Sequence, residues 1–279
     1  MKLDQVRTLN PLQRLLYFIQ EREAVRLKKE AGAPKPWTDD EILQNYRFTC
    51  VRRWDDKVSQ WLWKHWYEPN FDHPNMLAAC ALARFFNLPA TLETIGFPLQ
   101  WNWGRLKQKL RALKKRQTIF NAAYMVRGND GVDKIASVID FTIKPLVKRP
   151  PPLFRDSMEH TWENLRCRYG FGSFMAGQVV ADARWAIQGT WQDKDSWAPR
   201  GPGSVRGVNW LYQEIGPVSQ EEFEGRLEYV IDECKKNLPE QITSRLEAQD
   251  YQSCLCEYDK YSRTLFGQGK PKQLYPGRD

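Results

Sequence analysis

Apolar residues recur at helical spacing along much of the chain, most clearly over 219–238. The stripe there consists of Phe223, Leu227, Ile231, Cys234 and Leu238. Ser219 precedes it and Glu222 follows three residues later, a pairing typical of a helix N-terminus. The segment is therefore predicted to be an amphipathic helix whose apolar stripe belongs to the core and not to a binding site.

Caps and breakers predict further helices along the rest of the chain. Asn10 followed by Pro11 indicates a helix that runs to about Lys29, and Thr38 with Glu41 forms a capping box for a short one. Helices are also expected over 55–67, 74–86, 103–115, 132–143, 156–168, 173–187 and 242–265. Because no alternating pattern persists long enough for a strand, the predicted fold class is all-α.

The proline cluster near residue 150 is the best candidate for a linker. It lies in the segment KRPPP, where helix formation must stop. At 279 residues, the chain is long enough for one large domain or two small ones. We expect a single helical domain over 1–279, with two lobes joined near 148–153 as the alternative.

Charge and aromatic content favour a polyanionic partner. The net charge is +8, and the chain carries 12 tryptophans, 11 tyrosines and 13 phenylalanines. The basic residues concentrate in a run that contains no acid: Arg105, Lys107, Lys109, Arg111, Lys114, Lys115 and Arg116. The run follows Trp101 and Trp103, which favours contact with DNA phosphates over the alternative of a solvated helix face.

Cysteine and histidine spacing gives no sign of a metal site. The six cysteines are scattered, and the three histidines have no ligand spacing. We expect free thiols in a reducing cytoplasm, no metal and no cofactor. The sequence also shows no secretory signal and no run that approaches membrane-spanning length.

Two local motifs leave alternatives open. The segment 162–185 reads as helix, Gly-Phe-Gly turn, helix, so Gly170, Gly172 and Ser173 either bind a DNA phosphate or form an ordinary corner. Asp182 on the second helix is either catalytic or an ion-pair partner of Arg184 or a neighbour.

Two further segments carry charge in a pattern that suits a site. Glycines around Ser204 and Arg206 suggest a loop or an anion-binding nest. Glu257 and Lys260 share a helix face, so they belong either to a site or to a surface ion pair.

Residues 45–61, NYRFTCVRRWDDKVSQW, interleave charges with aromatic rings more densely than a solvated helix surface does. This segment resembles a motif of a known family, as do RYGFGSFMAGQVVADARW, APRGPGSVRGVNWL and LCEYDKYSRTLFGQGKP. The four blocks, in this order, resemble those of the α-glutamyl/putrescinyl thymine pyrophosphorylase family. That group includes amino acid:DNA transferases and the helical domain of 5-hydroxymethyluracil DNA kinases. The resemblance covers about residues 45–271.

The resemblance implies a helix-hairpin-helix fold like that of DNA glycosylases and a role in bacteriophage thymine hypermodification, which protects the genome from host restriction. A kinase phosphorylates 5-hydroxymethyluracil in double-stranded DNA, and a second protein displaces the phosphate, or pyrophosphate, with an amine or an amino acid such as glycine. The sequence shows no kinase module, which fits the second role, downstream of a separate kinase. The expected location is the cytoplasm, that of the host cell if the protein is viral.

The same resemblance suggests roles for individual residues. Cations would neutralise the leaving phosphate: first Arg52, Arg53 and Lys57, then Lys260 and Arg263. Asp182, Asp56 or Glu257 would take the proton of the attacking amine, and Arg206 would clamp the carboxylate of an amino acid donor. Gly170, Gly172, Ser173, Arg105, Lys107, Lys109 and Arg111 would contact DNA.

The chain departs from the family pattern at two positions of the first block. Cys50 stands where Asn is frequent, and Trp54 stands where a smaller residue is frequent. Both departures bear on the identity of the substrate. The alternative functions are a DNA glycosylase, in which Asp182 would stabilise an oxocarbenium ion, and a noncatalytic DNA-binding protein.

Overall fold

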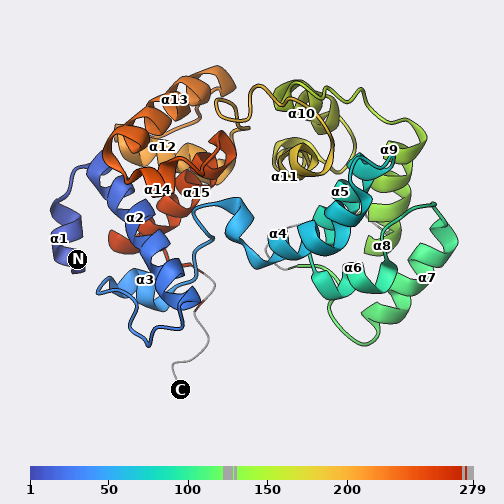
Figure 1. The fold of residues 1–279 in the computed structure, drawn as a ribbon, viewed down its shortest axis with the longest axis horizontal. Coiled ribbons are helices and arrows are strands. Elements are labelled where there is room, and N and C mark those ends of the chain that lie inside the picture. The colour runs from blue at the N-terminus through green and yellow to red at the C-terminus, as the bar shows by residue number, and fades with distance from the viewer. Residues whose placement is uncertain (122–127, 129–130, 272–273, 275–279) are drawn as a thin grey trace. The chain divides into compact units, whose positions relative to one another are not determined.

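The computed structural model describes residues 1–121, 128, 131–271 and 274, and over these residues the fold is all-α (Figure 1). Helices are the only regular elements described, apart from one isolated antiparallel bridge between Tyr46 and Leu274. The all-α prediction is therefore confirmed. The more specific likeness to DNA glycosylases stays a prediction.

The chain forms two compact units. Unit 1 comprises residues 1–56 and 195–279, and unit 2 comprises residues 57–194. The chain thus passes from one unit to the other at 56/57 and again at 194/195. The proline-rich segment 148–153 lies inside unit 2.

Unit 1 is built from the two ends of the sequence. Its helices are α1 (Leu3–Thr8), α2 (Pro11–Glu30), α3 (Glu41–Asn45), the 3-10 turn η1 (Arg53–Asp55), α12 (Pro202–Tyr212), α13 (Gln220–Asn237), α14 (Glu240–Thr243) and α15 (Ala248–Leu265). Aromatic rings from distant segments meet in its core. The centroid of the Phe18 ring, on α2, lies 5.5 Å from that of Phe48 and 5.2 Å from that of Tyr261. The predicted stripe of α13 is buried in this core, as expected.

Helix starts in unit 1 follow the local sequence, with two exceptions. The helix predicted over 242–265 is divided into α14, which ends at Thr243, and α15, which begins at Ala248. Asn10 accepts a hydrogen bond from the N–H of Gln13 at 2.9 Å, as its position before Pro11 predicts. The predicted Thr38–Glu41 capping box is wrong, because α3 is capped by Asp40, which accepts from the N–H groups of Ile42 and Leu43. The Thr38 hydroxyl instead donates to Glu21 of α2.

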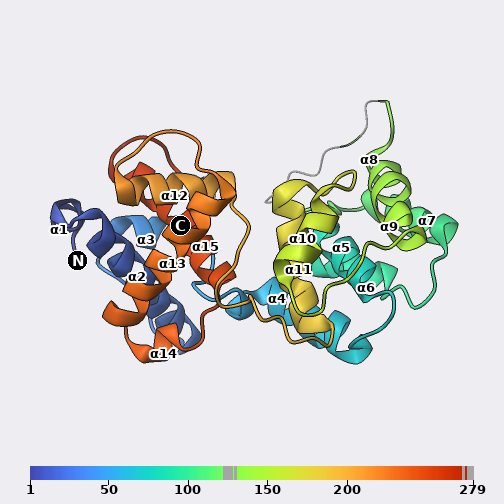
Figure 2. The same ribbon diagram turned by 90° about the horizontal axis from the view of Figure 1, so that it is seen from above.

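Helices α12 and α15 approach each other closely, and glycine permits this (Figure 2). A Cβ added to Gly207 would lie 2.1 Å from the backbone oxygen of Leu255, and one added to Gly203 would lie 2.2 Å from Cys256 Sγ. The expectation of a loop or anion nest around Ser204 is therefore wrong. These glycines lie within a helix and serve close backbone packing.

Unit 2 contains the remaining helices. They are α4 (Lys57–Leu62), η2 (Trp63–Tyr67), η3 (Glu68–Asn70), α5 (Met76–Phe86), α6 (Pro89–Ile95), α7 (Trp103–Lys114), α8 (Lys134–Ala136), η4 (Ser137–Ile143), α9 (Lys144–Lys148), α10 (Met158–Arg166) and α11 (Gly172–Ala186). Every residue of α5 is buried, as its small and apolar composition predicts. Helix α11 packs against α5 and α10.

No helix in the described part of the chain is both long and apolar enough to cross a membrane.

Candidate functional site

In unit 1, the loop 46–56 is held against α15 by its backbone. The N–H of Thr49 donates to Glu257 Oε2 at 3.3 Å, and the N–H of Arg53 donates to Asp250 Oδ1 at 2.7 Å. The acceptors are carboxylates on one helix and the donors are backbone N–H groups, so these two hydrogen bonds do not depend on the side chains of the loop. The first and fourth sequence blocks therefore meet.

A buried aspartate on α15 organises two arginines. Asp259, whose side chain is only 1% exposed, accepts from Arg206 Nε at 2.9 Å and from Arg263 Nε at 3.2 Å. Trp210 Nε1 also donates to it, at 3.3 Å. The third block, on α12, thus joins the fourth. We call Asp259, Arg206, Arg263 and Trp210 the Asp259 centre.

The arginines of the Asp259 centre remain available to a ligand. The side chains of Arg206 and Arg263 are 51% and 34% exposed, and only their Nε atoms bond to Asp259. No hydrogen bond from their Nη atoms to a described residue is formed. Guanidinium groups that are held in place and keep donors unused match phosphate or carboxylate oxygens.

Aromatic rings border the Asp259 centre. Trp210 stacks on Phe266 with a centroid separation of 5.5 Å, and the guanidinium of Arg14 lies 4.8 Å from the centroid of the Phe266 ring. Phe266 is 40% exposed. The centre therefore combines cations with a partly exposed flat surface.

Glu257 and Lys260 form an ion pair on the same helix, two residues before and one residue after Asp259. Lys260 Nζ lies 2.5 Å from Glu257 Oε1, while Glu257 Oε2 accepts from the Thr49 N–H. The Glu257 side chain is 7% exposed and that of Lys260 is 35% exposed. The predicted ion pair is confirmed, and its carboxylate is nearly buried while its amine reaches solvent.

Cys256 lies between these charged groups but is a poor nucleophile. Burial, with the nearby Glu257 carboxylate, raises the pKa of the Cys256 thiol to about 11. Since the thiolate is the reactive form, this thiol is protonated and unreactive at neutral pH.

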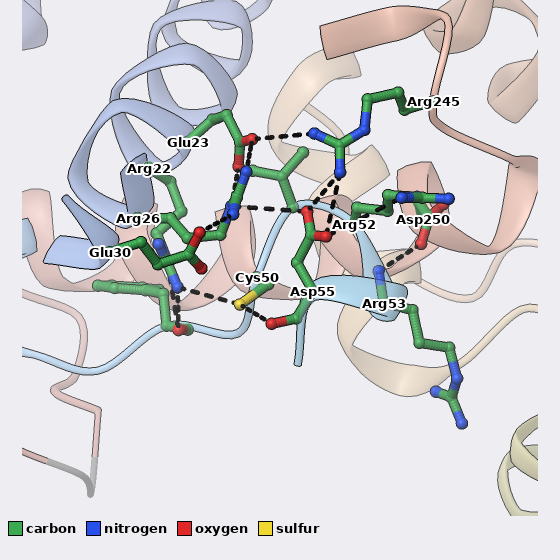
Figure 3. Close-up of polar contacts among 12 residues, drawn as sticks. Arg22, Glu23, Arg26, Glu30, Cys50, Arg52, Arg53, Asp55, Arg245 and Asp250 are labelled. Atoms are coloured by element: carbon green, nitrogen blue, oxygen red, sulfur yellow. Dashed lines mark hydrogen bonds and ion pairs between the residues drawn. The ribbon is translucent and has the colours of Figure 1, made fainter. Parts of the chain in front are cut away.

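A second network, shown in Figure 3, fixes the loop from its other side. Asp55 is buried and lies 3.1 Å from Arg245 Nη2, 3.5 Å from Arg26 Nε and 3.9 Å from Arg52 Nη1. Glu23 of α2 binds Arg26 through both carboxylate oxygens, and this hydrogen bonding raises the pKa of Arg26. The predicted phosphate ligand Arg52 is thus paired with an acid.

The other predicted residues of the first block fall on both sides of the unit boundary. Arg53 and Asp56 belong to unit 1, and Lys57 is the first residue of unit 2, where it is exposed. Cys50, the family departure, accepts from Arg22 Nη2 at 3.7 Å, and burial raises the pKa of its thiol. The roles predicted for these residues stay predictions.

In unit 2, Asp182 forms a closed ion pair. Its carboxylate accepts from Arg84 Nε at 2.5 Å and Nη2 at 2.7 Å, and from the Tyr67 hydroxyl at 2.5 Å. Asp182 is 0% exposed and the Arg84 side chain is 3% exposed. The partner is therefore Arg84 and not Arg184, whose guanidinium lies over the ring of Trp185. The catalytic role of Asp182 stays a prediction.

The predicted hairpin lies between α10 and α11. Gly170 and Gly172 adopt φ angles of +85° and +56°, which other residues rarely do. A Cβ on Gly170 would also lie 2.5 Å from Thr142 Oγ1. The two glycines are required for this turn, and its contact with DNA stays a prediction, as does that of Ser173 at the start of α11.

The basic run is only partly free of acids once the chain has folded. Lys107 pairs with Asp140 at 2.6 Å, and Arg111 and Lys114 lie 3.5 and 3.4 Å from Asp133. Arg105 has no acidic partner among the residues that the structure describes. Reading the run alone missed this neutralisation because both acids lie in a later segment.

Sequence reasoning also missed Asp259, Trp210 and Arg84. The spacing of Asp259 and Arg263, four residues apart on one helix, indicates an i,i+4 pair and was the available signal. No spacing links Arg84 to Asp182, which is 98 residues away. Among the described residues, no three His, Cys, Asp or Glu side chains gather to hold a metal ion.

Comparison with known proteins places the chain in a family. The sequence model of the 5-hmdU DNA kinase helical domain matches residues 10–270. The chain belongs to this family of helical domains. The match spans both units and all four sequence blocks, which confirms the resemblance to the helical domain of 5-hydroxymethyluracil DNA kinases.

One curated relative shows how much of such a protein the chain represents. It is a 5-hmdU DNA kinase of Bacillus phage SP10, 26% identical over 297 aligned residues, which cover 88% of this chain and 44% of the kinase. The chain thus spans less than half the length of that relative. No solved structure matches the chain.

Proposed function

We propose that the chain is a transferase acting on hypermodified DNA. It displaces phosphate, or pyrophosphate, from 5-phosphomethyluracil in double-stranded DNA with an amino acid such as glycine or with another amine. In this proposal it works in bacteriophage thymidine hypermodification, downstream of a DNA kinase. Membership in a family named for a 5-hmdU DNA kinase supports the pathway, and the Asp259 centre supports the chemistry.

The observation that carries the proposal is the geometry of the two arginines. Arg206 and Arg263 share one buried carboxylate and keep their Nη donors unused, so they can bind two anionic groups without rearranging. The reaction requires this, because both the leaving phosphate and the carboxylate of an amino acid are anions. We assign the donor carboxylate to Arg206 and the leaving phosphate to Arg263 and Lys260.

The bond changes follow from these assignments. The amine nitrogen forms a bond to the exocyclic methylene carbon of the base while the carbon–oxygen bond to phosphate breaks, and the phosphate leaves with the electron pair. The amine arrives as an ammonium ion and must first lose a proton. Glu257 takes this proton, because binding of Lys260 to the phosphate releases Glu257 Oε1 from the ion pair.

A direct assay tests the proposal. The protein is incubated with duplex DNA that contains 5-phosphomethyluracil and with a pool of amino acids, and the nucleosides are then analysed by mass spectrometry. We expect an aminoacyl adduct at the methylene carbon together with released phosphate. Abasic sites would identify a DNA glycosylase instead, and unchanged nucleosides despite DNA binding would identify a noncatalytic DNA-binding protein.

Two substitutions test the assignment of the base. Glu257→Gln is expected to lower the rate by about 10²- to 10⁴-fold, the usual contribution of a general base. Glu233→Gln is the matched control, because Glu233 forms the same i,i+3 pair with Lys236 on α13. If Glu257→Gln retains full activity and Asp182→Asn loses it, the base is Asp182 and our assignment is wrong.

A further inference from the structure

The tertiary structure sorts the cations of α7 into two sets. Lys107, Arg111 and Lys114 are neutralised by Asp140 and Asp133. Arg105 and Lys109, one turn apart, line a separate cavity, and Lys109 Nζ is held at its rim by the backbone oxygens of Thr94 and Ile95, at 3.1 and 3.3 Å. Of these five cations, only Arg105 and Lys109 line this cavity.

The cavity has the size and lining of a small-molecule site. Its volume is about 430 Å³, within the range typical of ligand pockets. Leu82 and Ile95 contribute apolar surface, and the rest of the lining includes Phe97, Gln100, Trp101, Asn102, Arg105 and Lys109. An aromatic wall, two amides and two cations thus converge within unit 2.

The ring of Trp101 is held in place by stacking and can stack on a planar ligand. Its ring stacks on Trp103 at a centroid distance of 4.8 Å and an interplanar angle of 14°, so Trp103 supports it from outside the cavity. The indole Nε1–H of Trp101 is buried and finds no acceptor among the described residues.

The position of α7 adds a further preference for a negative charge. Trp101 and Asn102 immediately precede the helix, whose N-terminal end carries the positive pole of the helix dipole. Arg105 stands in its first turn. The cavity therefore presents its cations and its helix end to the same ligand.

We propose that this cavity binds an unpaired nucleotide, with the base against Trp101 and the phosphate at Arg105. A free anion alone leaves the aromatic wall unused, and an apolar ligand leaves Arg105 and Lys109 without an anionic partner. A nucleotide uses all of these features at once, because every base offers a flat face and acceptor atoms. The inference goes beyond the proposed transfer reaction and does not rest on it.

Calorimetric titration of the whole chain tests this site without requiring any turnover. The probes are thymidine monophosphate, thymidine, inorganic phosphate and a short single-stranded oligothymidylate. We expect the monophosphate to bind about tenfold or more tightly than either thymidine or phosphate, since it alone offers both base and charge. Tighter binding of the oligonucleotide than of the monophosphate identifies a DNA strand as the source of the nucleotide, and equal binding identifies a free nucleotide.

Substitutions locate the binding. Trp101→Leu should weaken the monophosphate by roughly 5- to 100-fold, the range for loss of base stacking, and Arg105→Ala should weaken it by about tenfold. Arg166→Ala is the control, since Arg166 is likewise an arginine of unit 2 beside a tryptophan, over the ring of Trp162, but does not line the cavity. Circular dichroism confirms that each variant is folded.

Three results would each overturn the inference. They are the absence of binding to both the monophosphate and the oligonucleotide, equal affinity for phosphate and monophosphate, and equal effects of the Arg105 and Arg166 substitutions. None of these readouts depends on amino acid transfer. Failure of the transferase assay would therefore not contradict the nucleotide site, and absence of nucleotide binding would not contradict the transferase.

Discussion

Two buried aspartates, one in each unit, illustrate how the same residue type serves different ends. Asp259 in unit 1 and Asp182 in unit 2 both lie on helices, both are almost fully buried and both bind arginine. Their arginines differ. Arg84 is 3% exposed and directs its donors to Asp182, Asn87 and Ser59. Arg206 is 51% exposed and, among the residues that the structure describes, forms hydrogen bonds only through Nε.

The two pairs differ in the exposure of the arginine and not in that of the aspartate. A buried arginine has its donors used within the protein, whereas an exposed arginine keeps donors that a ligand can reach. A closed pair satisfies every polar atom within the protein and adds rigidity. In a pair with an exposed arginine, such as Arg206 and Asp259, the Nε atom binds the aspartate and the rest of the guanidinium faces solvent. Asp259 therefore holds two guanidinium groups that still face solvent, whereas Asp182 has its oxygens occupied by donors from Arg84 and Tyr67.

The largest expected effect is that of opening the closed pair. Arg84→Met should lower the free energy of unfolding by about 3–5 kcal/mol, because it leaves the charge of Asp182 buried and uncompensated. Urea denaturation followed by tryptophan fluorescence measures it. Arg206→Met, the matched substitution at the exposed pair, should lower the free energy of unfolding by about 1 kcal/mol or less. Equal losses for the two variants would contradict the distinction between the two pairs.

The reverse order is expected for activity. Arg206→Met should lower the rate of amino acid transfer at low donor concentration by about 10- to 100-fold, because the donor carboxylate loses a charge-assisted hydrogen-bond partner. Transfer is followed by nucleoside mass spectrometry with 5-phosphomethyluracil DNA. A variant that transfers at the wild-type rate would show that Arg206 is only a surface ion-pair partner.

The close approach of α12 and α15 offers a third test. Gly207→Ala should cost about 1–3 kcal/mol, because the new methyl group meets the backbone oxygen of Leu255 and forces the helices apart. Transfer activity should fall with it, since Arg206 moves away from Asp259. Gly225→Ala on α13 is the control, because its Cβ meets open space, and there we expect a gain of about 0.5–1 kcal/mol.

The smallest effect is expected at Cys256. With a pKa of about 11, its thiol is protonated at neutral pH, so Cys256→Ala should keep transfer within about twofold. Alkylation monitored by mass spectrometry should modify the exposed Cys167 first and reach Cys256 only as the pH approaches 11. Since burial raises this pKa above its ordinary value of 9.0, the stability that the thiol contributes is lost as pH rises from about 9 towards 11. Rapid modification of Cys256 at neutral pH would contradict this assignment.

Local sequence was a good guide wherever the deciding contact spans only a few residues. Asn10 before Pro11, Ser219 before Glu222 and the stripe of α13 all behave as predicted, because caps and amphipathic faces depend on neighbours within two turns. The pair of Glu257 and Lys260 was open to prediction for the same reason. Thr38 is not the cap because the helix begins later, at Glu41. The Thr38 oxygen accepts from the N–H of Asp40, and the Asp40 carboxylate accepts from the N–H groups of Ile42 and Leu43 in the first turn.

The amino-acid pattern was enough to predict the all-α class, the family and two of the four residues of the Asp259 centre, Arg206 and Arg263. Which charged side chains are buried in ion pairs and which keep their donors exposed to solvent depends on the tertiary structure. It brought Arg84 to Asp182, set Asp133 and Asp140 against part of the basic run, and left Arg105 facing a cavity. The physical reason is that periodicity and capping are local, whereas the neutralisation of a charge depends on partners that folding brings from distant parts of the chain.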